Sequence, residues 1–409
     1  MTHSKIGKTR IIFVDDEPDI LSGLRRMLRG QRNKWEMKFA ESGEEALGLL
    51  SKERFDVIIS DMRMPGMDGA QLLAEVMNTY PNIVRIVLSG HSDREMIYKS
   101  VGAAHQYLAK PCGPELLIRT VERACALRSL LVSKSLQELV SRLHTLPSLP
   151  SLFMEINDVL QSKNGSLSMV GEIISKDAGM TAKILQLVNS AFFGFYSEVT
   201  SPSQAVTLLG LDTVRALITS VHVFSELKEK KIGDIAVEDF WNHFFIVGSF
   251  SREIMKLESA DAKLIDMASM AGMLHDIGKI ILFTNLKEKY EEAMAIAKKQ
   301  GVCLNDVERR IFHSSHSQVG AYLLGLWGIP DDIIEAVFFH HDPGNSPERE
   351  FGLVTTLHVA NALVAEQAPS YTMGKLSQID YRHIETIGKL DRINVWKEKL
   401  LELLEKNRK

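Results

Sequence analysis

Acidic, hydroxyl and lysine side chains follow four short apolar runs in the first part of the chain. Short apolar runs separated by helical patterns are typical of buried parallel strands. Because ligands gather outside the carboxyl ends of such strands, we expect these side chains to converge on one site. Clustered carboxylates favour a hard cation, and such a cation together with a lysine suits phosphoryl transfer. The residues are the pair Asp15-Asp16, then Asp61, Ser89 and Lys110.

This arrangement resembles the receiver domain of two-component response regulators over roughly residues 8–128. The resemblance implies that Asp61 accepts a phosphoryl group from a sensor histidine kinase or a phosphotransfer protein. It also implies that Ser89 binds the new phosphate and that Tyr107 follows by changing its rotamer. A generic doubly wound domain with solvated acidic strand ends is the alternative, but the match in residue type and order favours the receiver. The implied ligands of Mg²⁺ are Asp15 (through water), Asp16, Asp61 and the backbone carbonyl of Arg63.

The composition is ordinary for a soluble globular protein. The chain has 409 residues, 45% of them hydrophobic and 24% charged, and this length allows about two or three domains. A net charge of −4 gives no sign of a nucleic-acid-binding surface, so we expect no direct DNA binding. No run reaches the ~18 apolar residues that a membrane span needs, and we recognise no signal peptide. The three cysteines are odd in number and widely spaced, which suggests free thiols and a cytoplasmic location.

An apolar pattern at near-helical spacing runs from Glu115 to about His144 without glycine or proline. A helix of this extent would be ~45 Å long, which is too long for the last receiver helix alone. We therefore predict a helical connector over residues 115–145 that carries the signal onward, either as a lever or as the seam of a homodimer. A plain amphipathic helix packed on the second domain fits the pattern equally well.

Beyond Pro147 almost all signals are helical, and several separated motifs resemble the HDOD family, the HD-related output domain of bacterial signalling proteins. We therefore predict an α/β doubly wound (flavodoxin-like) receiver, an all-α HD-like domain over residues 146–365 and a helical tail over residues 366–409. The motifs lie at residues 146–150, 174–185, 188–194, 205–211 and 274–279.

Most of the thirteen histidines fall in the second half of the chain. The adjacent pair His275-Asp276 is the one that binds metal in HD phosphohydrolases, which the HDOD family resembles. Neutral imidazoles with a carboxylate suit iron, manganese or zinc, and a bound metal can activate water for attack on a phosphodiester, with Lys279 steadying a phosphate oxygen. The candidate ligands are His243, His275, Asp276, His316, His340 and His341; the histidines that do not match, expected on the surface or in the core, are His222, His313 and His358.

The sequence departs from the enzyme pattern in two places. Asn361 stands where HD phosphohydrolases supply a late aspartate, and residues 342–347 lack the Gly-Tyr-Pro signature of relatives that hydrolyse cyclic di-GMP. Three interpretations stay open: the histidines only pack, they bind metal without hydrolysis, or they form a phosphohydrolase acting on a nucleotide or cyclic dinucleotide. We favour a response regulator whose HDOD domain acts on an unidentified protein partner. A transcription factor is disfavoured, because we find no helix-turn-helix module.

Overall fold

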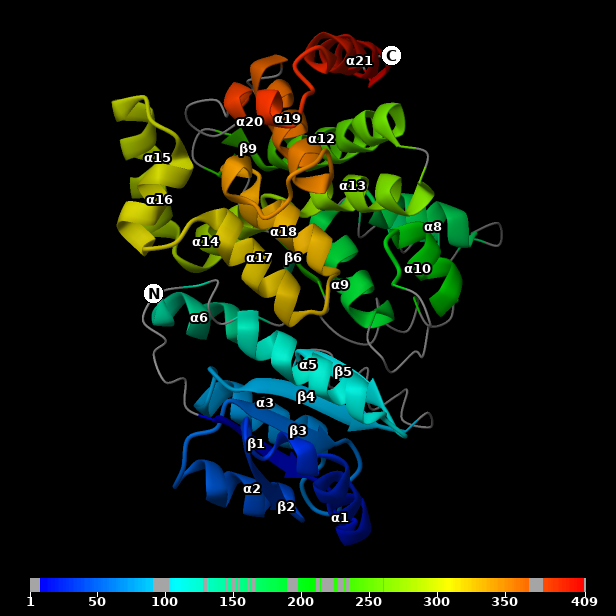
Figure 1. Cartoon of the computed structure of the whole chain (residues 1–409), viewed down its shortest axis with the longest axis vertical. Coiled ribbons are helices and arrows are strands. Elements are labelled where there is room, and N and C mark those ends of the chain that lie inside the picture. Colours follow the sequence, from blue (N-terminus) through cyan, green and yellow to red (C-terminus); the bar gives the residue numbers. More distant parts are fainter. Residues whose placement is uncertain are drawn as a thin grey trace.

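The structure is a computed structural model, and its first domain is an α/β unit that is followed by a larger helical unit (Figure 1). The described residues are 8–90, 103–127, 131, 133–143, 146–148, 152, 155–156, 158–159, 162, 166–189, 198–210, 214, 224–226, 231–232, 235–259, 261–367 and 378–407.

Five parallel strands form the sheet of the N-terminal domain, in the order β2-β1-β3-β4-β5. Their apolar sequences follow from burial of both sheet faces by helices. This confirms the predicted doubly wound class, with a mostly helical region after it. The strands are β1 (Thr9–Val14), β2 (Trp35–Ala40), β3 (Val57–Asp61), β4 (Val84–Ser89) and β5 (Gln106–Ala109). The helices are α1 (Pro18–Met27), the 3₁₀ turn η1 (Arg29–Gln31), α2 (Gly43–Leu50), α3 (Gly69–Thr79) and α5 (Pro114–Leu127).

The carboxyl ends of the strands meet at one edge of the sheet. Asp61 and Ser89 are the last residues of β3 and β4, and Lys110 follows β5 directly. The loop after β3 turns back tightly: a Cβ atom on Gly69 would lie 2.1 Å from the carbonyl oxygen of Asp61. Only glycine allows this close approach, so Gly69 brings the start of α3 against the end of β3.

The predicted uninterrupted helix from Glu115 to about His144 is wrong. Helix α5 ends at Leu127, and a separate helix, α6 (Lys134–Ser141), begins after Ser133. Ser133 is extended (φ −76°, ψ 112°), and its hydroxyl accepts a hydrogen bond from the backbone N–H of Leu136. A serine in this position caps a new helix and does not continue an old one. Both α5 and α6 contact α17 of the same chain, so each is a short packed helix.

The C-terminal region is a helical domain in which the described residues also form two short strand pairs, β6 with β7 and β8 with β9. Long helix α12 packs against α13 and α19, and α17 packs against α14 and α18, which encloses the core. The helices are α8 (Leu167–Ile174), α9 (Ala178–Val188), α10 (Pro202–Leu209), α12 (Val237–Glu258), α13 (Ala262–Leu274), α14 (Ile277–Asn285), α15 (Lys287–Gln300), α16 (Leu304–Phe312), α17 (His316–Leu326), α18 (Asp331–Phe339), the 3₁₀ turn η4 (Pro343–Asn345) and α19 (Leu353–Gln367). The short strands are β6 (Leu146–Ser148), β7 (Phe224–Glu226), β8 (Lys231–Ile232) and β9 (Ile235–Ala236).

The predicted C-terminal tail contains α20 (Tyr381–Thr386) and α21 (Arg392–Asn407), which pack on the helical domain. The carboxylate of Glu258, at the end of α12, accepts hydrogen bonds from Lys389, Arg392 and Trp396. The tail is thus fixed to α12 by one buried acidic side chain. In the described part of the chain, no helix combines the length and the apolar character that crossing a membrane requires.

Candidate functional sites

The N-terminal domain brings two acidic residues and one lysine together at the carboxyl edge of its sheet. Nζ of Lys110 lies 2.6 Å from Oδ2 of Asp15 and forms a second ion pair with Oδ1 of Asp61. The other oxygen of Asp61 accepts a hydrogen bond from the backbone N–H of Arg63 at 2.7 Å. Asp15 and Asp61 are almost fully buried, at 2% and 8% exposure. The predicted convergence of β1, β3 and β5 on one site is therefore present.

Burial and neighbouring charges oppose one another at this site. Burial raises the pKa of Asp61, with a smaller contribution from Asp15, and this outweighs the lowering effect of Lys110 and the Arg63 N–H. Burial alone would lower the pKa of Lys110, but its bonds to Asp15 and Asp61 raise it. Lys110 is therefore a firmly held cation next to a carboxylate that is costly to ionise.

The other residues predicted for this site lie around the same edge. Asp16 follows Asp15 and is half-buried, whereas Ser89 is fully buried at the end of β4. Arg63 is exposed, and its backbone N–H contacts the site by donating to Asp61. Tyr107 lies on β5 opposite Val87 of β4 and is 1% exposed.

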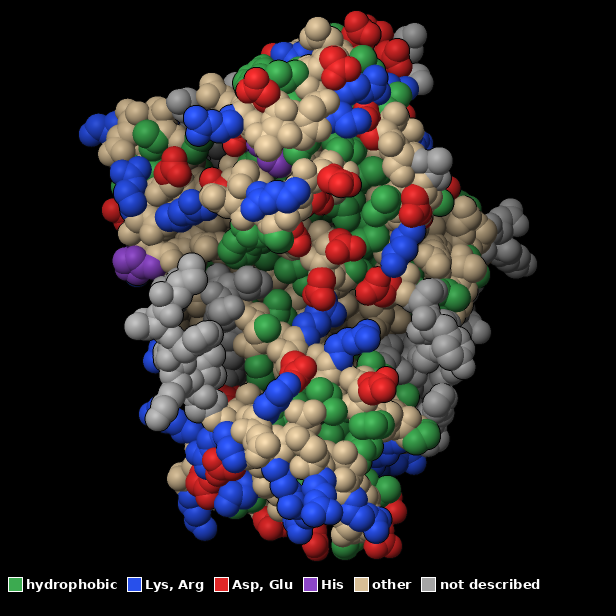
Figure 2. Space-filling model, viewed as in Figure 1, with side chains coloured by type: hydrophobic (Ala, Val, Ile, Leu, Met, Phe, Trp, Pro, Cys, Tyr) green, Lys and Arg blue, Asp and Glu red, His purple; other side chains and the backbone are tan. Residues whose placement is uncertain are grey.

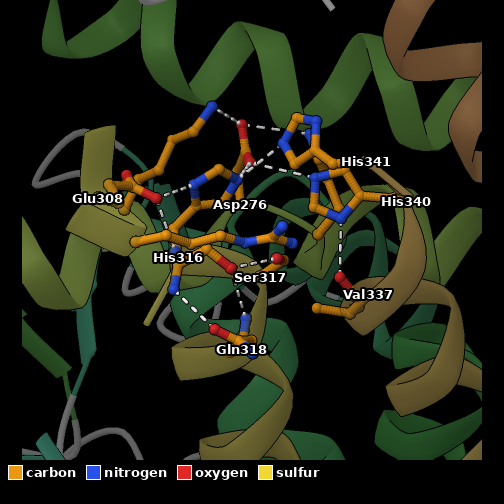
Figure 3. A network of polar contacts seen from close by, with 12 residues as sticks. Asp276, Glu308, His316, Ser317, Gln318, Val337, His340 and His341 are labelled. Atoms are coloured by element: carbon orange, nitrogen blue, oxygen red, sulfur yellow. Dashed lines mark hydrogen bonds and ion pairs between the residues drawn. The ribbon is translucent and has the colours of Figure 1, made fainter. Parts of the chain in front are cut away.

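The helical domain gathers a second cluster, formed where helices end or begin. His275 directly follows α13, Asp276 precedes α14, His316 opens α17 and His340 directly follows α18, while His243 comes from the first half of α12. Figure 3 shows His316, His340 and His341 directed toward Asp276. All of the predicted ligands are therefore brought together, although they come from five separate elements.

A glycine allows two of these elements to meet. Gly278 follows the His275-Asp276 pair by two residues, and a Cβ atom there would lie 1.9 Å from the carbonyl oxygen of His316. The start of α14 can therefore lie directly against the start of α17. This contact gives a structural reason for the glycine within the motif at residues 274–279.

The two carboxylate oxygens of Asp276 face different imidazoles. Oδ1 lies 3.2 Å from Nε2 of His316 and 3.8 Å from Nε2 of His340. Oδ2 lies 3.2 Å from Nε2 of His275 and 3.6 Å from Nε2 of His243. Two groups of potential ligands, each with its atoms within 4.8 Å of one another, therefore share Asp276: His316, His340 and His341 form one with it, and His243 and His275 the other.

Backbone carbonyls determine which nitrogen of two histidines faces the cluster. Nδ1 of His275 lies 2.7 Å from the oxygen of Gly272, and Nδ1 of His340 lies 2.7 Å from the oxygen of Val337. A carbonyl only accepts hydrogen bonds, so Nδ1 carries the proton and Nε2 presents a lone pair. Both Nε2 atoms are buried and lack a hydrogen-bond partner within the described part of the chain. A metal ion would supply the missing partner.

Burial keeps several of these imidazoles neutral. It lowers the pKa of His243 to about 3, and burial together with neighbouring imidazoles places the pKa of His340 and His341 well below the usual range. Burial acts to raise the pKa of Asp276, but His275, Lys279 and His316 reverse this and hold it well below its usual value. Burial acts to lower the pKa of His316, but Glu308 and Asp276 outweigh burial and raise it. His243, His340 and His341 thus offer neutral nitrogens next to an ionised carboxylate, which is the form that metals bind.

The sequence did not single out Glu308, which is fully buried next to His316. Oε2 of Glu308 lies 2.6 Å from Nδ1 of His316 and accepts a hydrogen bond from its backbone N–H at 2.8 Å. A carboxylate behind a histidine orients the ring and raises its basicity, as in many metal sites. One sequence feature could have identified Glu308: it is a charged residue on the apolar face of a helix. The other residues on that face of α16 include Leu304, Val307 and Phe312.

The structure also shows the surroundings of the other residues that the sequence analysis singled out in the helical domain. Asn361 of α19 hydrogen-bonds His243, and Nζ of Lys279 lies 2.6 Å from Oδ2 of Asp276. His358 is a core histidine: its Nδ1 donates to the oxygen of His340, and its Nε2 accepts from the N–H of Asp380. His313 is exposed, as predicted for a surface histidine, whereas His222 lies outside the described residues. Little histidine surface is visible on the face drawn in Figure 2, in keeping with the burial of the cluster.

Models of two protein families match the chain, and they cover the two domains separately. The response regulator receiver domain matches residues 11–122, and the HDOD domain matches residues 146–343. The chain belongs to the response regulators and joins a receiver domain to an HDOD domain.

Curated relatives match only parts of this response regulator. An uncharacterized protein of Treponema pallidum is 26% identical over 250 residues, which are 60% of this chain and 48% of the relative. The hydrogenase transcriptional regulatory protein HoxA of Cupriavidus necator is 40% identical over 116 residues, 28% of this chain and 23% of HoxA. The chain thus spans about half the length of the first relative and about a quarter of the second.

Solved structures resemble either the receiver domain or a larger part of the chain. The signal receiver domain of an HD domain-containing protein from Pseudomonas fluorescens Pf-5 is 31% identical, with coverage of 29% of this chain and 95% of that one and a TM-score of 0.28. The MmoQ response regulator of Methylococcus capsulatus is 22% identical, with coverage of 60% and 98% and a TM-score of 0.45.

Proposed function

We propose that this chain is a cytoplasmic, phosphorylation-controlled response regulator in which Asp61 is the phosphoacceptor and the HDOD domain is the output. The observation that carries the proposal is the single ammonium of Lys110 between Asp15 and Asp61. An oxygen of Asp61 attacks the phosphorus of a phosphohistidine on a sensor kinase or phosphotransfer protein. The O–P bond of an aspartyl phosphate forms, the P–N bond breaks, and the imidazole leaves with its electron pair. Lys110 faces the developing charge on the phosphoryl oxygens.

The donor set at this edge fits Mg²⁺. Asp15, Asp16 and Asp61 supply hard carboxylate oxygens, and the backbone carbonyl of Arg63 supplies another. These carboxylates lie close together. Burial is the main reason why the pKa of Asp61 is raised, and the neighbouring charge of Asp15 adds to this effect. When bound, the ion would neutralise these carboxylates and part of the charge on the incoming phosphoryl group.

The histidine cluster supports a proposal that the HDOD domain binds iron, manganese or zinc. Within the described residues, the inward-facing Nε2 atoms of His275 and His340 have no hydrogen-bond partner, and Asp276 is shared by both groups of ligands. Neutral imidazoles with one carboxylate suit these metals. Asn361 adds no charge where a further carboxylate would strengthen the site, and His275, Asp276 and His340 are 0% exposed. We therefore favour a metal site that does not hydrolyse a substrate.

A metal-dependent phosphohydrolase acting on a nucleotide or cyclic dinucleotide is the second candidate. One observation favours it: the side chain of Lys279, 11% exposed, places Nζ beside Asp276, where it can hold a phosphate oxygen. Robust turnover of cyclic di-GMP by the metal-loaded protein would place this candidate first. We expect weak or no turnover.

The output that we propose is a protein–protein interaction, with the receiver controlling a surface of the HDOD domain. Its support is the direct contact of α5 and α6 with α17, which joins the two parts of the chain. The domain limits that we propose are residues 8–128 for the receiver, 146–365 for the HDOD domain and 366–409 for the tail. A homodimer through residues 115–144 stays a prediction.

Phosphorylation of the purified chain tests the proposed acceptor. A small phosphodonor such as acetyl phosphate, with Mg²⁺, should label the wild type at Asp61 and leave Asp61→Asn unlabelled. Equal labelling of both proteins would refute the assignment. Asp16→Ala provides the matched control, since it should keep the acceptor but require more Mg²⁺.

A further inference from the structure

A fully buried arginine joins the receiver to the next part of the chain. Arg85 of β4 is 1% exposed, and its Nη2 donates a hydrogen bond to the carbonyl oxygen of Ser141 at 2.5 Å. Ser141 is the last residue of α6. The same guanidinium donates through Nε to the oxygen of Ala103 at 2.5 Å and through Nη1 to the oxygen of Ile83 at 3.2 Å. Arg85 thus fixes the end of α6 to the receiver sheet.

His105, which precedes β5, makes the contact tighter. Its Nδ1 accepts a hydrogen bond from the backbone N–H of Arg85 at 3.1 Å, and its Nε2 lies 2.9 Å from Nη2 of the same arginine. The same Nε2 lies 3.1 Å from the oxygen of Ser141. The backbone oxygen of His105 accepts a hydrogen bond from Nε2 of Gln186, a residue of α9 in the HDOD domain. One buried cluster of Arg85, His105, Ser141 and Gln186 therefore spans both domains.

The charge of Arg85 makes this contact conditional on docking. Burial lowers the pKa of Arg85 to about 9, although the phenols of Tyr322 in α17 and Tyr107 in β5 act to raise it. The side chain therefore stays cationic at neutral pH. A buried charge is costly unless it is fully hydrogen-bonded, and a main acceptor here is the oxygen of Ser141. Movement of α6 would leave the guanidinium short of one acceptor, which couples the position of α6 to the receiver sheet.

Arg85 and the phosphorylation edge lie on one face of the receiver sheet. Side chains alternate along a strand, so Arg85, Val87 and Ser89 of β4 point the same way. On β5, Tyr107 is opposite Val87, and Ala109 is opposite Ser89. One row of side chains thus runs from Ser89, beside the phosphoacceptor, past Tyr107 to Arg85 at the domain interface.

In the described part of the chain, other polar contacts between the domains lie away from this cluster. Nδ2 of Asn82 donates to Glu138 of α6 at 3.0 Å, but this pair is exposed. Arg123 of α5 bonds the oxygen of Ile329 and lies 2.8 Å from Asp331, whose side chain is 76% exposed. The exposed Asn82–Glu138 pair contributes little to docking, whereas the bond from Arg123 to Ile329 is part-buried and comes from α5. In Figure 1, α5 and α6 lie between the receiver sheet and the helices α9 and α17.

We infer that Arg85 and His105 form the docking site by which the receiver holds α6 and α9, and that phosphorylation of Asp61 is transmitted to the HDOD domain at this site. The transmission of Asp61 phosphorylation at this site rests on the proposed function. The docking of α6 and α9 by Arg85 and His105 concerns the unphosphorylated protein and depends only on the contacts described above. Arg85 is a positioning residue in this scheme, because it touches neither the phosphoryl group nor its ligands.

Hydrogen exchange in full-length Arg85→Met tests both the docking and the transmission. In the resting protein, amide exchange in α6 should accelerate about tenfold or more, since the charged hydrogen bond from Arg85 to Ser141 is lost. Exchange in α9 should also rise, because Gln186 of α9 bonds His105, which packs against Arg85. Beryllofluoride with Mg²⁺ should alter α6 and α9 in the wild type but produce no further change there in the variant. Phosphorylation of Asp61 by acetyl phosphate should stay at the wild-type level.

Arg123→Met is the matched control, because it removes an arginine that also crosses the interface but lies off the β4–β5 row. It should keep the response of α6 and α9 to beryllofluoride. Wild-type exchange and response in Arg85→Met would overturn the inference. If Arg85→Met destabilises the receiver, Gln186→Leu provides a second variant, because it removes a hydrogen bond from the HDOD side alone. Gln186→Leu should still weaken the response of α9 to beryllofluoride. An unchanged response of α9 in this variant would also overturn the inference. A wild type that takes up no phosphoryl group would refute the proposed function, while the resting comparison would still decide whether Arg85 holds α6.

Discussion

Nζ of Lys110 lies 2.6 Å from Oδ2 of Asp15, which is 95 residues away in the sequence, and the same ammonium pairs with Asp61. One cation therefore neutralises parts of two buried carboxylates. Burial nevertheless raises the pKa of Asp61, so this carboxylate is held ionised at a cost to the stability of the folded receiver. Binding of a cation at this site, or removal of the negative charge of Asp61, should therefore stabilise the folded receiver.

Asp61→Asn should therefore stabilise the receiver at neutral pH without Mg²⁺, by roughly 1 kcal/mol. The pKa of Asp61 is raised in the folded state, so the cost of ionisation is fully present above that raised pKa. It disappears as the pH falls toward the ordinary value of 3.8. Native-state hydrogen exchange of strands β1 and β3 at two pH values would measure this. An equal or lower stability of Asp61→Asn at pH 7 would contradict the argument.

We predict from the histidine cluster that the purified protein contains a bound metal. Wild-type protein purified anaerobically should carry iron, manganese or zinc, and the double variant His275→Ala, Asp276→Ala should lose it while the receiver stays folded. Asp276 is the ligand shared by both groups, so its loss should empty both. Elemental analysis gives the answer, with circular dichroism as the check on folding. A metal-free wild type would mean that these histidines serve packing alone.

Asn361→Asp should strengthen the metal site. The side chain of Asn361 is 4% exposed and hydrogen-bonds His243, so an aspartate there adds a charge next to the ligands. We expect metal retention to improve by roughly 10- to 100-fold, as for other groups around metal ligands. Competition with a chelator would measure it, and the exposed Asn345→Asp serves as control. If both variants release metal at the wild-type rate, Asn361 has no part in the site.

Ser133→Ala should loosen α6 by about 1 kcal/mol, because it removes the hydroxyl that caps the helix at the N–H of Leu136. Faster exchange of the amides at the start of α6 would show this effect. Lys134→Ala, at the exposed first residue of the helix, is the control and should change exchange much less. Equal exchange in Ser133→Ala and the wild type would argue for a helix that continues through this position.

The receiver site could be predicted from the sequence because each of its residues ends or follows an apolar strand. Parallel strands align their carboxyl ends, so Asp15, Asp61 and Lys110 had to meet. The break before α6 was missed because apolar residues continue at helical spacing on both sides of Ser133, and periodicity does not show a cap. Arg85 appeared only as a polar residue within a buried strand, since its partners belong to segments far away in the sequence.

The histidine cluster was predicted by resemblance to a family and not by spacing, because its ligands come from five separate elements. Sequence alone could not order them around Asp276 or show which imidazole nitrogen faces inward. Both depend on carbonyl groups at helix ends, such as those of Gly272 and Val337, which any residue type supplies.

A phosphoryl group on Asp61 should change the HDOD domain. Hydrogen exchange of the full chain with and without beryllofluoride and Mg²⁺, in the wild type and in Asp61→Asn, measures this change. We predict altered exchange in α6 and α9 of the wild type and none in Asp61→Asn. A change confined to the receiver strands of the wild type, with α6 and α9 unaffected, would contradict the account.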